Sequence, residues 1–89
     1  MIIFYPDGSR YYFNDEGQIH RENGPAGIYK GFTSYYLYKE YCINGKLHRA
    51  DGPAIEYADG RKSWYYKGKC IPVTSQQEFE RYLNLLVFI

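Results

Sequence analysis

Two His-Arg pairs give this chain its clearest potential for ligand chemistry. His20-Arg21 and His48-Arg49 lie 28 positions apart, and a Gly-Pro-Ala string follows each pair at the same offset. Arginines held in register, beside turns rich in free backbone N–H groups, are suited to binding a phosphate or a carboxylate. One hypothesis is therefore a site for a phosphorylated, nucleotide-type small molecule, with Arg21 and Arg49 on the anion and an aromatic ring such as Trp64 stacked on the base.

The same pairs also have a structural interpretation. Adjacent residues of a strand point to opposite faces, so the His and Arg of one pair do not converge, whereas equivalent residues of successive units stack. His20 is then expected near His48, and Arg21 near Arg49. In this interpretation each histidine donates to a neighbouring backbone carbonyl, and each arginine pairs with an acidic turn residue such as Glu22 or Asp51. The sequence leaves both uses open.

Metal binding and catalysis have weaker support. His20, Cys42, His48 and Cys70 are zinc-type ligands, but they form no closely spaced knuckle, and their equal intervals follow from the repeat. Cys42 is better explained as a small core residue. The chain contains no Ser-His-Asp order, no Gly-x-Ser-x-Gly elbow and no Walker loop. We therefore expect no metal, no cofactor and no enzymatic activity.

Aromatic residues are the compositional outlier, since twelve Tyr, five Phe and one Trp make up 20% of the chain. Such side chains suit half-buried strands and also form adhesive contact surfaces. We expect Trp64 and Tyr65, which point to opposite faces of one strand, to contact a protein partner. Eleven basic and ten acidic residues give a net charge of +1, so nucleic acid is not an expected partner.

The repeat itself predicts a stacked architecture built from short hairpins. Asp-Gly and Asn-Gly pairs mark the turns, and the strand-like runs between them are 2–5, 10–14, 27–29, 33–43, 54–57 and 62–66, with very short pieces at 18–20 and 46–48. We expect one domain, 1–89, with units at about 7–29, 30–57 and 58–73. The second unit carries a five-residue insertion, which we place within 30–39. The third has Cys70-Ile71-Pro72 where His-Arg is expected.

The end of the chain changes period. Ser75 and Glu78 fit a capping box, and Phe79, Tyr82, Leu83 and Leu86 follow at helical spacing. This pattern predicts one helix at about 76–86, which either caps the stack or, together with the apolar tail 87–89, forms a homodimer interface. No stretch is apolar enough to span a membrane and no secretory signal is evident, so we expect a cytoplasmic protein with free cysteines.

The segment 45–60, Gly-Lys-Leu-His-Arg-Ala-Asp-Gly-Pro-Ala-Ile-Glu-Tyr-Ala-Asp-Gly, resembles the HR-x-x-GPA repeats of small phage, giant-virus and bacterial proteins. These are similar to MORN-type repeats, and the resemblance covers about 7–69. It implies a row of antiparallel β-hairpins used as a scaffold or for binding proteins or lipid head groups. The predicted fold is thus a mainly β, MORN-like repeat sheet capped by one C-terminal α-helix. The leading functional hypothesis is a non-enzymatic binding or adaptor protein, and a phage origin would suggest an inhibitor of a host protein.

Overall fold

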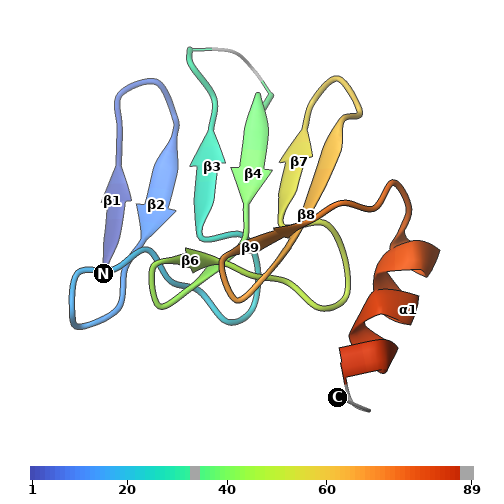
Figure 1. Cartoon of the computed structure of the whole chain (residues 1–89). Helices are drawn as coiled ribbons and strands as arrows, with labels where there is room; N and C mark the ends of the chain where they lie inside the picture. The colour runs from blue at the N-terminus through green and yellow to red at the C-terminus, as the bar shows by residue number, and fades with distance from the viewer. Residues whose placement is uncertain (33–34, 87–89) are drawn as a thin grey trace.

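A computed structural model describes residues 1–32 and 35–86. This part of the chain folds into an open antiparallel sheet of seven strands, a two-stranded sheet at its lower end and one C-terminal helix (Figure 1). The large sheet has the strand order β1-β2-β3-β4-β7-β8-β9, and β5 pairs with β6. The predicted row of hairpins closed by one helix is therefore confirmed. The elements are β1 (Ile2–Phe4), β2 (Arg10–Tyr12), β3 (Gly27–Tyr29), β4 (Tyr38–Glu40), β5 (Cys42–Ile43), β6 (Lys46–Leu47), β7 (Ile55–Tyr57), β8 (Lys62–Tyr66), β9 (Lys69–Ile71) and α1 (Gln76–Leu86).

The strand predictions fail where pairing with a distant segment decides the outcome. The expected single strand at 33–43 is wrong, because β4 and β5 are separate and pair in different sheets. Its first two residues, 33 and 34, lie outside the described part of the chain. The piece at 18–20 contributes only a bridge between Ile19 and Phe13. Strand β9 was not predicted as a strand, and it pairs with β8 where the repeat loses its His-Arg string.

Each strand presents alternate residues to the two faces of the sheet. In Figure 1 the helix lies at the β8–β9 end, where Phe79 of α1 packs with Trp64 and Ile71 in the main hydrophobic cluster. Phe79 is fully buried. Among the described residues, no helix lies on the opposite face of the sheet. The thin core is thus concentrated under α1, at the last hairpin.

The predicted capping box sets the start of α1. The Ser75 hydroxyl accepts a hydrogen bond from the Glu78 N–H at 3.2 Å, and the Glu78 carboxylate accepts one from the Thr74 hydroxyl at 2.7 Å. The first bond satisfies a backbone N–H that the first helical turn leaves unpaired, and the second holds the Glu78 side chain back against the residues that precede the helix. The apolar tail 87–89, which the dimer hypothesis invokes, lies outside the described residues. Within the described ranges, no helix combines the length and the apolar character needed to cross a membrane.

Candidate functional site

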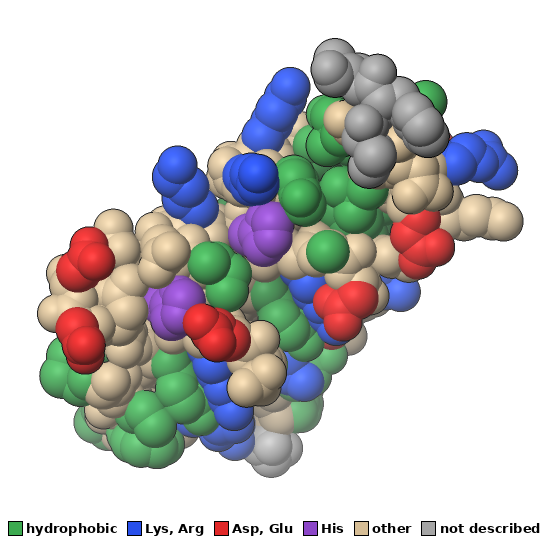
Figure 2. All heavy atoms as spheres, turned by 90° about the horizontal axis from the view of Figure 1, so that it is seen from below, with side chains coloured by type: hydrophobic (Ala, Val, Ile, Leu, Met, Phe, Trp, Pro, Cys, Tyr) green, Lys and Arg blue, Asp and Glu red, His purple; other side chains and the backbone are tan. Residues whose placement is uncertain are grey.

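The two repeat histidines link consecutive units. Nδ1 of His20 accepts a hydrogen bond from the Asn44 N–H at 2.9 Å, and Nδ1 of His48 accepts one from the Lys67 N–H at 2.9 Å. Each donor lies in the hairpin turn of the following unit. Both histidines lie at the lower end of the molecule, as Figure 2 shows. The expectation that they donate to carbonyls is wrong, because the nearest unpaired groups are turn N–H donors, which only the neutral imidazole can accept.

The two repeat arginines lie flat on tyrosine rings of the other strand of their own hairpin. The Cζ atom of Arg21 is 4.0 Å from the ring centroid of Tyr12, and that of Arg49 is 3.8 Å from the centroid of Tyr41. The backbone confirms that Tyr12 and Tyr41 are equivalent, since their carbonyls accept the N–H of the histidine that precedes each arginine. A guanidinium stacked on a tyrosine gains a cation–π interaction.

The Gly-Pro-Ala string completes this arrangement. Nη1 of Arg21 donates to the Pro25 carbonyl at 3.2 Å, and Nη1 of Arg49 donates to the Pro53 carbonyl at 3.1 Å. A Cβ atom at Gly52 would lie 2.6 Å from the Arg49 Cζ, closer than real contacts allow. The repeated string is therefore explained by local structure, since proline supplies an acceptor and glycine leaves room for the guanidinium.

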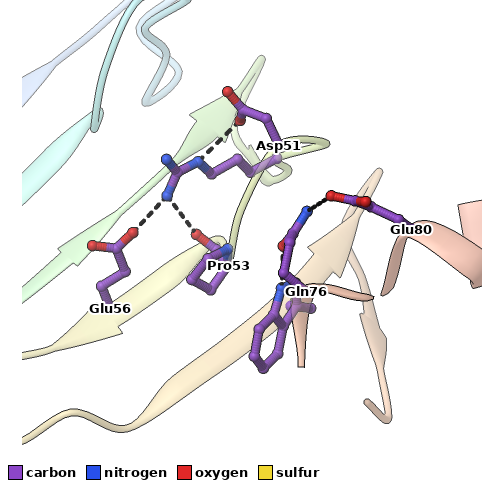
Figure 3. A network of polar contacts seen from close by, with 7 residues as sticks. Asp51, Pro53, Glu56, Gln76 and Glu80 are labelled. Atoms are coloured by element: carbon purple, nitrogen blue, oxygen red, sulfur yellow. Dashed lines mark hydrogen bonds and ion pairs between the residues drawn. The ribbon is translucent and has the colours of Figure 1, made fainter. Parts of the chain in front are cut away.

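Arg49 is held by two carboxylates in addition to the proline carbonyl. Figure 3 shows Asp51, Pro53 and Glu56 around its guanidinium. Nε lies 3.1 Å from the Asp51 Oδ1, and Nη1 lies 2.6 Å from the Glu56 Oε1. The Arg49 side chain is 21% exposed. The expected pairing with Asp51 is confirmed, and Glu56 is an additional partner that the spacing did not reveal.

Arg21 has no such carboxylate. The residues at the positions of Asp51 and Glu56 are Asn23 and Ile28, and Arg21 forms no ion pair with any carboxylate in residues 1–32 or 35–86. The expected pairing with Glu22 is wrong, because the Glu22 carboxylate lies 3.8 Å from the imidazole of His20. The two arginines therefore share their stacking but differ in charge compensation.

Both arginines line one open pocket of about 410 Å³ between the two His-Arg loops, together with His48. Glu22 and Asp51 line the same pocket. Two carboxylates thus face two guanidinium groups, and the pocket carries no excess of positive charge to attract a phosphate. His20 does not contribute to its lining.

The structure separates the last two predicted site residues. Trp64 is 5% exposed, packs under α1 and donates from Nε1 to the Gln76 Oε1 at 2.8 Å. The prediction that Trp64 stacks on a base or contacts a partner is wrong, because the helix covers its ring. Tyr65 points to the opposite face and is half-buried there.

Besides Tyr65, that opposite face carries a group of tyrosines that the sequence pattern did not single out. The rings of Tyr29 and Tyr38 lie 5.3 Å apart between centroids, and those of Tyr38 and Tyr57 lie 6.1 Å apart. They are aligned because these residues are direct partners across β3, β4 and β7. The equal offset of Tyr29 and Tyr57 from the two Gly-Pro-Ala strings was the available signal. We call this surface the tyrosine face, formed by Tyr5, Tyr11, Tyr29, Tyr38, Tyr57 and Tyr65.

The four zinc-type side chains lie in different surroundings. Cys42 is buried, and this burial raises the pKa of its thiol to about 12. Cys70 is exposed, and both cysteines are free thiols. In the described part of the chain, no group of three or more His, Cys, Asp or Glu side chains could hold a metal ion.

A scan against protein-family models and searches of curated proteins and solved structures find no match to this chain. Its function must therefore be inferred from its own geometry.

Proposed function

We propose that this chain is a non-enzymatic binding protein that holds a protein partner on its tyrosine face. The observation that carries the proposal is the row of Tyr29, Tyr38 and Tyr57 rings, in mutual contact on the side of the sheet away from α1. Tyrosine offers a large, stiff contact area at a small cost in side-chain entropy, and its hydroxyl can remain hydrated. Aromatic residues of this kind are enriched at protein–protein interfaces.

The shape of the molecule supports a flat contact of this kind. Its principal extents are 46 × 32 × 17 Å, so one broad face is larger than the roughly 800 Å² that each partner buries in a typical specific interface. The balanced charges of the pocket between Arg21 and Arg49 give no comparable support for a phosphorylated ligand, and we do not extend the proposal to one. Because the repeats resemble those of phage proteins, we extend the proposal to a partner that is a host protein, which the binding would inhibit.

The test compares partner capture by the unmodified chain and by a Tyr38→Ser/Tyr57→Ser double variant. A captured protein is identified by mass spectrometry, purified, and titrated against both chains by calorimetry. Loss of two central interface tyrosines is expected to weaken binding by about 2 kcal/mol or more, which is roughly 30-fold. Circular dichroism verifies that the double variant keeps the fold.

The matched control is Lys62→Ala, an exposed residue on the opposite face of β8. It is expected to leave binding unchanged. Equal affinity of the double variant and the unmodified chain would refute the proposal, as would a stronger effect of Lys62→Ala.

A further inference from the structure

Two turns of this protein have the same backbone hydrogen bonds but differ in sequence at their second and fifth residues. The segments are Tyr-Pro-Asp-Gly-Ser at 5–9 and Tyr-Ala-Asp-Gly-Arg at 57–61. In each, the tyrosine N–H donates to the carbonyl of the fifth residue at 2.9 Å, and the glycine N–H donates to the tyrosine carbonyl at 3.0 Å. The glycine φ angles are 89° and 95°. The aspartate of each turn accepts the N–H of the fifth residue, at 2.8 and 3.0 Å. The relevant difference is therefore Ser9 in the first turn and Arg61 in the later one.

In the later turn the chain supplies its own cation. The Cζ atom of Arg61 lies 4.4 Å from the ring centroid of Tyr57, and its Nε lies 2.7 Å from the Asp59 Oδ2. The Tyr-x-Asp-Gly turn thus binds a guanidinium between an aromatic ring and a carboxylate, through cation–π attraction and a charge-assisted hydrogen bond.

In the first turn no arginine of the described residues takes that place, and the nearby cation is Lys30, whose Cδ and Nζ atoms lie 3.2 and 3.7 Å from the position that a Cβ atom on Gly8 would occupy. Ser9 is short and 2% exposed, and a pocket of about 420 Å³ lies beside it. Besides Ser9, the walls of this pocket are Tyr5, Asp7, Tyr11, Phe13, Ile19 and Tyr29. The rings of Tyr5 and Tyr11 meet edge to face at 5.7 Å. Within residues 1–32 and 35–86, Asp7 forms no ion pair.

Hydrogen bonds within the turn keep Asp7 available as an anion. The N–H of Ser9 donates to its carboxylate, which lowers the pKa of Asp7 from its ordinary value. The lining of the pocket therefore combines aromatic rings with one carboxylate, the combination that recognises organic cations.

We propose that this first-turn pocket binds an arginine side chain of a protein partner, with the guanidinium on the Tyr5 ring and the Asp7 carboxylate, as Arg61 lies on Tyr57 and Asp59. The inference rests on the proposed function, because the pocket belongs to the tyrosine face. Arginine is preferred to lysine because its planar guanidinium stacks on a ring while it donates in plane to a carboxylate, whereas the lysine ammonium is a strongly hydrated point charge.

The test is a titration of the ¹⁵N-labelled full chain, followed by NMR, with Nα-acetyl-arginine N-methylamide as the probe. The citrulline analogue is the neutral control of nearly the same shape, and the lysine analogue tests the preference for a guanidinium. Saturable shifts are expected at the amides of Gly8, Ser9 and Tyr11. The citrulline analogue is expected to bind at least about tenfold more weakly, because it loses the charge.

Two variants address the site directly. Asp7→Asn removes the charge but keeps an oxygen that accepts the Ser9 N–H, so the turn persists and the affinity for the probe falls about tenfold. Ser9→Arg provides the first turn with its own guanidinium, as in the later turn, and blocks the probe. Asp59→Asn, the same change in the already occupied turn, is the matched control and leaves the affinity unchanged.

The inference is overturned if the arginine probe gives no shifts at the first turn, if citrulline binds equally well, or if Asp7→Asn binds like the unmodified chain. Failure of Ser9→Arg to fold leaves Asp7→Asn to decide. The outcome is separable from that of the proposed function, because partner capture that depends on Tyr38 and Tyr57 can persist in a protein whose first-turn pocket rejects arginine.

Discussion

The second hairpin, formed by β5 and β6, and the third hairpin, formed by β8 and β9, cover equivalent aromatic rings in different ways. In the second, the ring of Tyr41 lies under the guanidinium of Arg49. In the third, Trp64 occupies that position, Pro72 stands where the arginine would be, and the helix covers the indole with Phe79. Where the repeat pattern ends, the apolar side chain of Phe79 therefore takes the place of an arginine over the aromatic ring.

This difference shows what the repeat motif supplies. In the His-Arg loop, the arginine covers an aromatic ring, and the histidine accepts a hydrogen bond from the turn of the next unit. The third hairpin has neither residue, and it needs a separate element to bury its larger ring. The helix is therefore the structural substitute for the missing His-Arg loop.

The largest expected effect tests this substitution. Phe79→Ala removes the one fully buried large apolar side chain of α1 and leaves a cavity over Trp64. We expect the free energy of unfolding, measured with urea, to fall by about 3–5 kcal/mol. Leu85→Ala is the control on the same helix, since Leu85 is 64% exposed, and should change stability little. Similar losses for both variants would contradict the assigned role of the helix.

A smaller effect distinguishes the two arginines. Arg49→Ala leaves the Glu56 carboxylate and the Pro53 carbonyl without their donor, and should cost about 2–3 kcal/mol of unfolding free energy. Arg21→Ala loses only the stacking on Tyr12 and one neutral acceptor, and should cost about 1 kcal/mol. Denaturant unfolding of both variants measures the difference. The reverse order would show that the carboxylates do not strengthen the second unit.

The smallest effect is a pH dependence of the link between the second and third units. Burial, assisted by the charge of Lys67, lowers the pKa of His48 below its ordinary 6.5. The folded state therefore favours the neutral imidazole, which accepts the Lys67 N–H. This contribution, about 1 kcal/mol, is complete above pH 6.5 and is lost as the pH falls through the lowered value.

Thermal unfolding between pH 5 and 7.5 measures this effect. The control is His48→Asn, whose side-chain oxygen accepts a hydrogen bond without titrating in this range, so its pH dependence should be the shallower of the two. Identical slopes for the two proteins would exclude the histidine as the cause.

The elements that depend on local chemistry could be predicted from the sequence. The Ser75–Glu78 capping box and the periodic apolar residues predicted α1 within the bounds that the structure gives. The hairpin turns followed from Asp-Gly and Asn-Gly pairs, because these residues tolerate the backbone angles that tight turns require. The strands β3 and β8 match their predicted runs, because turn residues mark where each run begins and ends.

Features that depend on which segments meet in space could not be predicted in this way. The alternation in β8 separated Trp64 from Tyr65, but it did not show which of the two faces α1 would cover. The histidines were expected to donate, because the sequence does not reveal that turn N–H groups of the next unit are their nearest partners. The pocket beside Ser9 is recognised only when its turn is compared with the one that contains Arg61.

The histidine links have a consequence for how such a protein can lengthen. The second unit carries both halves of the link, since its Asn44 N–H donates to His20 of the unit before it and its His48 accepts the Lys67 N–H of the unit after it. A further 28-residue copy inserted ahead of the last hairpin would bring both halves of the connection with it. The sheet could then be extended without changes to the units on either side of the insertion. The helix α1 would still cover the indole ring of Trp64 in the last hairpin.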